Sequence, residues 1–317
     1  MLRFASRVLS FIALISAGNA QEVYPSRPIT MIVPFAAGGA SDIIARVIGE
    51  EMGKALGQRI IHENVPGAGG STALTRLARA APDGYVIAIG NSGTNAAVYT
   101  IYKDLAFKPD AFAPIGLVAR TAAMIAVKKD LPQKDVAALA AYARQNPGKL
   151  TFGHAGVGSS NYLICKMFLQ AAGIDITLVA YRGAAPALQD LIGGQIDGVC
   201  DNATSLAGAV QAGQVHGLVV SAAARLATMP GVPTSEEAGL AAFQAQGWNA
   251  LFAPRGAPGA VMTRLNEALR AAMQSELLRK RYADIETTAA AGDDLSPEYL
   301  NAYVPAEIEK FRKLLAE

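Results

Sequence analysis

Apolar and polar positions along this chain follow a repeating order, in which a short apolar run leads through a turn into a segment with helical spacing. The first unit passes from residues 29–33 through two glycines into residues 43–52, where apolar side chains recur at helical intervals. Apolar runs at 59–62 and 85–89 enclose a helical segment at 72–81. Strand, turn and helix in this order predict a doubly wound, mostly parallel α/β sheet.

The same order recurs in the middle of the chain. Apolar runs at 150–153, 176–181 and 195–200 are predicted strands, and helical segments at 161–172 and 185–192 lie between them. A second sheet of the same kind is therefore expected. Ligands of such sheets bind beyond the carboxyl ends of the strands.

The last third contains helical patterns at 260–273 and 297–315. Pro305 lies inside the second pattern. Because proline lacks an N–H group and clashes with the preceding turn, we predict that it kinks or splits this helix.

No low-complexity linker divides the chain, so the two sheets are expected to be joined by strand crossovers near residues 120 and 222. This organisation predicts a two-lobed α/β binding protein. Residues 21–120 with 222–317 would form lobe 1, and residues 121–221 would form lobe 2.

The N-terminus has the pattern of a signal peptide. Arg3 and Arg7 precede an apolar run at residues 8–17, and Gly18-Asn19-Ala20 follows as a small-x-small site. The run has about half of the ~20 residues that a membrane span needs. We therefore predict cleavage after Ala20 and a soluble protein exported to the periplasm.

Charge and composition narrow the class of partner. The chain has 28 basic and 26 acidic residues, and removal of Arg3 and Arg7 leaves equal numbers. A neutral protein is not expected to bind nucleic acid or an anionic membrane surface. The three histidines, His62, His154 and His216, are isolated in sequence, so we predict no metal site. We also predict no cofactor, and we expect a monomer.

The two cysteines, Cys165 and Cys200, are too few for a disulfide scaffold and lack metal-ligand spacing. They are either buried small side chains or a single bridge. A bridge is favoured by architecture, because a helix start and the carboxyl end of a strand lie side by side in such sheets.

Two glycine-rich turns near the N-terminus carry the clearest chemical signal. They contain Gly38-Gly39 and Gly67-Ala68-Gly69-Gly70, each directly before a predicted helix. Glycine allows a ligand to approach the backbone closely, and the first N–H groups of a helix have no partner within it. Such turns are seats for an anion.

Polar residues near these turns have more than one interpretation. Ser41 or Asp42 is predicted to cap the first helix, although Asp42 is also a candidate general base. Ser160 and His154 allow a serine hydrolase, in which Ser160 attacks and His154 is the base. The competing interpretation is that Ser159 and Ser160 cap a helix.

Arg182 and Trp248 are also open to two interpretations. Arg182 follows a predicted strand, where its guanidinium can meet a ligand carboxylate, point into solvent or pair with Asp201. Trp248, the one tryptophan, lines the cleft or fills the core.

Together these segments resemble the substrate-binding proteins of tripartite tricarboxylate transporters. The resemblance extends over essentially the whole chain after Ala20. Its motifs, in chain order, are Tyr24-Pro25-Ser26-Arg27-Pro28-Ile29, 34–39 with Asp42, 67–70, 181–188 with Asp190-Leu191, Arg225 with 230–234, 237–239 and 251–254.

The resemblance implies a periplasmic receptor that closes two lobes around a small organic carboxylate and passes it to a membrane permease. It implies that backbone amides and hydroxyls of the turns hold the carboxylate. Carried over by position, the ligand-binding residues are Ala37, Gly38, Gly39, Ser41, Asp42, Gly67, Ala68, Gly69, Gly70, Ser92 and Thr94 in lobe 1, and Gly158, Ser159, Ser160, Arg182, Gly183, Ala184 and Asp201 in lobe 2.

The sequence does not select one ligand among citrate-like acids, amino acids and aromatic carboxylates. His154 departs from the family pattern, where a small polar residue is usual, and Pro305 departs from an unbroken helix. A receptor that signals to a sensor kinase is an alternative to a transport receptor.

Overall fold

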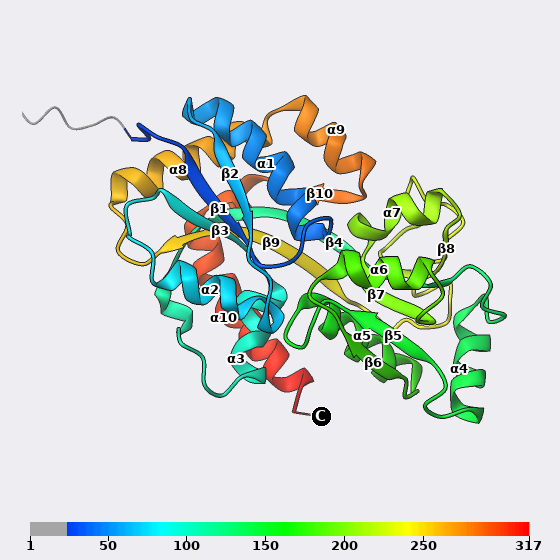
Figure 1. Ribbon diagram of the computed structural model, residues 1–317. Helices are drawn as coiled ribbons and strands as arrows, with labels where there is room; N and C mark the ends of the chain where they lie inside the picture. The colour runs from blue at the N-terminus through cyan, green and yellow to red at the C-terminus, as the bar shows by residue number, and fades with distance from the viewer. Residues whose placement is uncertain (1–23, 317) are drawn as a thin grey trace, which may run out of the picture.

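The computed structural model describes residues 24–316, so the predicted signal peptide and its cleavage point lie outside the described residues. Two α/β halves lie side by side, joined by long strands that run between them (Figure 1). The strands are β1 (Ile29–Val33), β2 (Ile60–Asn64), β3 (Val86–Asn91), β4 (Phe112–Lys128), β5 (Thr151–His154), β6 (Thr177–Ala180), β7 (Gly198–Asn202), β8 (Val215–Ser221), β9 (Gln246–Pro254) and β10 (Thr287–Ala289).

Helices follow most of the strands, as the sequence pattern predicts. The α-helices are α1 (Ala40–Leu56), α2 (Ser71–Ala78), α3 (Val98–Ile101), α4 (Val136–Gln145), α5 (Ser160–Ala172), α6 (Ala184–Ile192), α7 (Ala203–Gln211), α8 (Gly259–Met273), α9 (Glu276–Asp284) and α10 (Pro297–Leu314). Short 3₁₀ or π turns are η1 (Ala68–Gly70), η2 (Gly93–Ala97), η3 (Pro109–Ala111) and η4 (Gly292–Leu295). Within residues 24–316, no helix is both long and apolar enough to cross a membrane.

The strand order is β2-β1-β3-β9-β4-β7-β5-β6, with β8 and β10 also paired to β4. Strands β1, β2 and β3 are parallel, as are β5, β6 and β7. The two-lobed α/β fold is as predicted, but β4 and β9 at its centre are antiparallel. One carries the chain out of the first half and the other carries it back, so adjacent pairing makes them run in opposite directions.

Strand β4 connects the halves within its own length. Its first part pairs with β9 and β10, and its second part, from Ala123 onward, pairs with β7 and β8. The chain returns through β9 only after residues 222–245. Met229 and Val232 in this segment pack with Leu206 of the second half, and Phe243 packs edge-on against Phe168.

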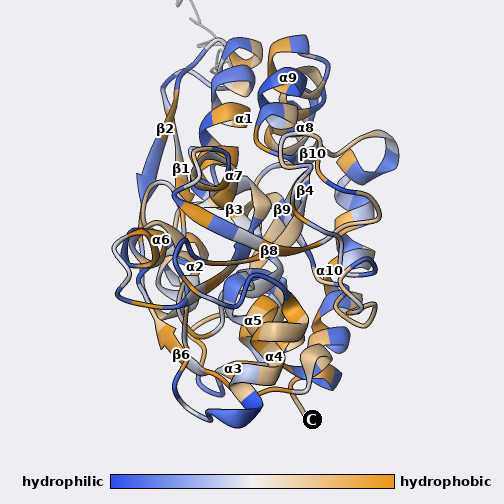
Figure 2. Cartoon of the chain, turned by 90° about the vertical axis from the view of Figure 1, so that its right-hand side faces the viewer, coloured by the Kyte–Doolittle hydropathy of each residue, from blue (hydrophilic) through white to orange (hydrophobic). Residues whose placement is uncertain are grey.

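Each half has its own apolar core. The first is built around Ile32, Ile44 and Leu251, while the second has separate clusters on the two sides of its sheet. Figure 2 shows hydrophilic and hydrophobic stretches alternating along α1 and α9, as in helices that cover a sheet with one face. Trp248 is 1% exposed and its indole Nε1 donates to Glu307 Oε2 at 3.0 Å, which confirms the core interpretation of this residue.

Pro305 does not split the last helix, because α10 continues from Pro297 to Leu314 with the proline inside it. That part of the prediction was wrong. Leu300 before the proline and Phe311 after it are both buried in the first core. Packing on both sides of the proline offsets the single backbone hydrogen bond that it removes.

Candidate ligand-binding site

The turn after β1 is supported by a buried carboxylate. Neither Ser41 nor Asp42 caps α1 as predicted, because Gly39 occupies the N-cap position. Asp42 lies in the first helical turn and its Oδ2 accepts from the backbone N–H of Gly38 at 3.0 Å. The side chain thus reaches back over the helix start, as the acidic residue of a capping box does.

Neighbouring hydrogen-bond donors stabilise the ionised form of Asp42. Arg46 Nε and Nη2 donate to its two oxygens, each at 3.0 Å, and Asn64 Nδ2 donates at 2.9 Å. Burial opposes ionisation, but hydrogen bonds from Arg46, Gly38 and Asn64 outweigh it, so the pKa of Asp42 is lowered. With its oxygens occupied, Asp42 supports the turn and is poorly suited to act as a general base.

The second glycine turn fits closely against the other half of the molecule. Gly69 has φ 61°, and a Cβ atom built on it would lie 2.0 Å from the carbonyl oxygen of Val157. No larger residue can be accommodated without moving one of the two turns. Gly69 therefore marks a direct contact between the halves.

A buried polar cluster supports a third turn, which directly follows β3 in the chain. The sequence identified this turn only through Ser92 and Thr94. Asn91 Oδ1 accepts from the N–H groups of Gly93 at 2.9 Å and Thr94 at 3.1 Å, and Asn91 Nδ2 donates to Ser41 Oγ at 3.2 Å. Ser41 Oγ in turn donates to Asn249 Oδ1 at 2.9 Å. The sequence signal for Asn91 was its place at the carboxyl end of a strand, whereas Asn249 had none.

In the second half, the turn after β5 contains the residues of the hydrolase hypothesis. Ser159 Oγ accepts from Tyr162 N at 3.2 Å and donates to Gly156 O at 2.6 Å, so it caps α5. His154 Nδ1 accepts from Gly156 N at 3.1 Å, and burial lowers the His154 pKa. Among the described residues no hydrogen bond joins His154 to Ser160, whose Oγ faces Asn161 Oδ1 at 3.5 Å. The geometry favours the capping interpretation.

Asp201 and Arg182 are not paired. Asp201 is 3% exposed and its Oδ1 accepts from Asn161 Nδ2 at 2.5 Å and Asn202 N at 2.7 Å. Burial raises the pKa of Asp201 to about 6. The Arg182 side chain is exposed, and its carbonyl oxygen accepts from Ala36 N at 3.4 Å across the two halves.

A disulfide joins Cys165 of α5 to Cys200 of β7, with their Cα atoms 5.3 Å apart. It fixes the helix that begins at Ser160 to the strand that carries Asp201. No group of three or more potential ligands for a metal ion is found within residues 24–316.

The predicted turns meet in pairs at the boundary between the halves. A Cβ on Gly39 would lie 3.3 Å from Ala184 Cβ, and one on Gly93 would lie 2.4 Å from Ser160 N. The turn before α1 therefore faces the start of α6, while η1 and η2 face the turn before α5. Two predicted side chains do not take part in these contacts, since Asp42 binds Arg46 and Asn64 and Arg182 points to solvent.

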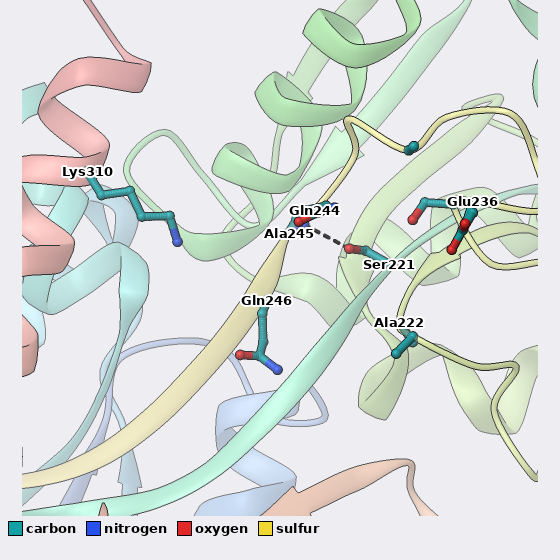
Figure 3. Close-up of a pocket in the computed structure, with 10 residues that line it drawn as sticks. Ser221, Ala222, Glu236, Gln244, Ala245, Gln246 and Lys310 are labelled. Carbon is teal, nitrogen blue, oxygen red and sulfur yellow. Dashed lines mark hydrogen bonds between the residues drawn. The ribbon is translucent and has the colours of Figure 1, made fainter.

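A hollow of about 640 Å³ lies elsewhere, beside the strands that join the halves. Figure 3 shows Lys310 of α10 extending toward Gln246, with Glu236 on the opposite side. None of the predicted ligand residues lines it. A narrow gap lined by Ser92 and Ser160 borders the same Gln246 and Lys310, so the hollow lies behind the turns.

Comparison with known proteins identifies the fold and the family. Residues 44–314 match the model of the tripartite tricarboxylate transporter family receptor. The chain belongs to this receptor family. Its members are binding proteins, and the chain is accordingly a periplasmic solute-binding protein.

Solved structures of similar proteins agree with this assignment. The receptor is 34% identical to the periplasmic binding protein BugD, with a TM-score of 0.89 over 92% of this chain and 98% of BugD. It is 38% identical to MatC from Rhodopseudomonas palustris with bound malate, with a TM-score of 0.88 over 92% and 99% of the two chains. A second R. palustris protein, solved with adipate, is 32% identical with a TM-score of 0.87 over 92% and 97%.

Proposed function

We propose that this receptor captures a small organic carboxylate between its two halves and delivers it to the membrane subunits of a tripartite tricarboxylate transporter. The observation that carries the proposal is the meeting of backbone turns from both halves, built from glycine, alanine and serine. Turns of this kind present N–H groups and hydroxyls to an anion at the start of a helix.

The electrostatics of the turns support a carboxylate ligand. Asp42 is neutralised by Arg46, and Asp201 is buried with a raised pKa. A ligand carboxylate therefore meets N–H dipoles, and the negative charge of Asp42 is offset by Arg46. Two relatives of known structure hold malate and adipate, which are small dicarboxylates.

We propose that binding and release require the halves to rotate about the strands that join them. In this proposal the first hinge lies within β4, near residues 120–123, where its pairing passes from β9 and β10 to β7 and β8. For the second, the packing of residues 222–245 on the second half favours a boundary near Gln246 instead of 222. Of the described residues, lobe 1 would then contain 24–122 with 246–316.

Two matched glycine variants test the site. Gly69→Ala places a Cβ against Val157, whereas Gly148→Ala adds the same atom at φ 71° where nothing lies within 4 Å. Both variants carry backbone strain, so only the contact between the halves differs. We expect Gly69→Ala to lose most carboxylate binding and Gly148→Ala to retain it.

The measurement is calorimetric titration with acids first found by a thermal-shift screen of di- and tricarboxylates, amino acids and aromatic acids. A ligand at a hundred times its Kd stabilises the fold by ~2.7 kcal/mol, which gives a clear melting shift. Equal affinity in both variants would contradict the proposed site, and failure of every acid would contradict the ligand class.

A further inference from the structure

Tyr102 lies at the end of α3 and reaches from the first half of the molecule to the second. Its hydroxyl donates to the carbonyl oxygen of Val157 at 2.9 Å. Its ring lies over Gly158, where an added Cβ would approach Tyr102 Cε2 to 2.9 Å. One aromatic side chain thus covers two consecutive residues of the turn that precedes α5.

The same carbonyl group also lies against Gly69 of the first half. Gly69 lies so close that a Cβ on it would be 2.0 Å from Val157 O, and Gly156 lies near the Gly69 backbone. The Val157 carbonyl group therefore contacts two residues of the first half, Gly69 and Tyr102. Loss of either contact would free the turn that carries Ser159 and Ser160.

Tyr102 is suited to hold this contact without a ligand. Its ring packs partly against the first core, so its position is set by its own half. Burial raises its pKa, so the hydroxyl remains a donor at neutral pH. The Val157 side chain is 41% exposed, which puts the contact at the rim and not in the interior.

From this geometry we propose that Tyr102 is a positioning residue that latches the two halves together and slows the escape of a bound ligand. The part concerning ligand escape rests on the proposed function, whereas the latch itself does not. A hydrogen bond of this kind contributes about 0.5–1.5 kcal/mol, so its loss is expected to speed release roughly two- to tenfold.

The test compares Tyr102→Phe with Tyr99→Phe. Tyr99 lies on the same short helix, and its ring packs edge-on against Phe107 within the first half. Spin labels are attached at Glu267→Cys on α8 of the first half and at Gln145→Cys on α4 of the second half. Pulsed electron paramagnetic resonance then gives the distance between the halves, with and without malate. Stopped-flow measurements give association and release rates of malate.

We expect Tyr102→Phe to shift the label distance toward longer values in at least one of the two states, and to speed malate release with little change in association. Tyr99→Phe should match the parent protein. Distance distributions that coincide for Tyr102→Phe and parent in both states would overturn the latch. If malate fails to bind while the distance still shifts, the choice of ligand is wrong and the latch stands.

Discussion

Two carboxylates, one in each half of the molecule, support turns of the candidate site in opposite ways. Asp42 and Asp201 are each 3% exposed. Asp42 is paired with the cation Arg46 and its pKa is lowered, whereas Asp201 accepts from the uncharged Asn161 and Asn202 and burial raises its pKa to about 6. Equal exposure therefore does not determine charge, because Asp201 lies deeper in the protein and only Asp42 has a cation to offset its burial.

The two turns are also held to their own halves by different kinds of bond. In the first half, Asp42 accepts both from Arg46 of α1 and from Asn64 at the end of β2, which links the start of α1 to β2. In the second half, the Cys165–Cys200 disulfide ties α5 to β7 beside Asp201. We expect the first turn to depend on charge and the second on a covalent bond and on protonation.

The largest effect should come from removing the disulfide. Replacing both cysteines by alanine releases a link across 35 residues of sequence, and we expect the free energy of unfolding to fall by about 3 kcal/mol. Chemical denaturation measures it. Dithiothreitol should produce a similar loss in the parent and none in the variant; a parent unaffected by complete reduction would show that the covalent bond does not support this half.

The next effect concerns the ion pair. Asp42→Asn removes the negative charge and leaves one acceptor oxygen in place of two, so Arg46 and Gly38 cannot both keep their bonds. We expect a loss of about 2 kcal/mol, because Asp42 is buried but Arg46 is half exposed. Glu50→Gln is the matched control, since its exposed carboxylate on the same helix pairs with Arg281. It should cost less than about 1 kcal/mol. Equal losses of unfolding free energy in Asp42→Asn and Glu50→Gln would show that the buried ion pair matters no more than an exposed one.

Asp201→Asn should act in the opposite direction and vary with pH. Because burial raises the folded-state pKa above the unfolded value, the parent loses stability as pH rises from about 4 to about 6, and above pH 6 it carries the full cost of the buried charge. We expect the variant to be about 1–3 kcal/mol more stable than the parent at pH 8, with the difference shrinking as pH falls from about 6 toward 4.

Melting temperatures of variant and parent across this pH range measure the difference, and the comparison cancels the contributions of His62 and His154. Those two histidines have lowered pKa values, mainly through burial, and destabilise both proteins as pH falls below about 6.5. A difference that grows toward low pH would contradict the raised pKa of Asp201.

The smallest effect is expected for Arg182→Ala. The side chain is exposed at the edge of the turns and has no hydrogen-bond or ion-pair partner within residues 24–316, so it contributes to the local positive field without a fixed partner there. We expect carboxylate affinity to fall by about two- to fivefold at low salt and to change little at high salt. A loss above a hundredfold, independent of salt, would instead show a direct bond to the ligand.

Much of this fold could be predicted because its signals are local. Glycines before helical segments marked the turns, and the repeating strand and helix order marked the two sheets. The antiparallel pairing of β4 with β9 could not be predicted, because it joins segments more than a hundred residues apart. The boundary near 222 remains a prediction, and the packing of residues 222–245 on the second half leads us to propose Gln246 in its place.

The candidate site likewise contains residues that local sequence signals identify and residues that they do not. Its turns were identified from sequence, but Asn249 and Tyr102 were not, since their partners Ser41 and Val157 are 208 and 55 residues away. The role of Asp42 was misjudged at the N-cap, because Gly39 takes that position and leaves the carboxylate free to bond Gly38 and Arg46. The N-cap preference of Ser and Asp alone does not show which neighbouring residue takes that position in the folded helix.

The most direct test of the site is a crystal structure with the acid that binds best in the thermal-shift screen. We predict that a ligand carboxylate lies between the halves and accepts hydrogen bonds of about 3 Å from backbone N–H groups of the turns at residues 37–41, 67–70 or 158–160. A ligand found instead in the hollow beside Lys310 and Gln246, with the turns unoccupied, would contradict the account.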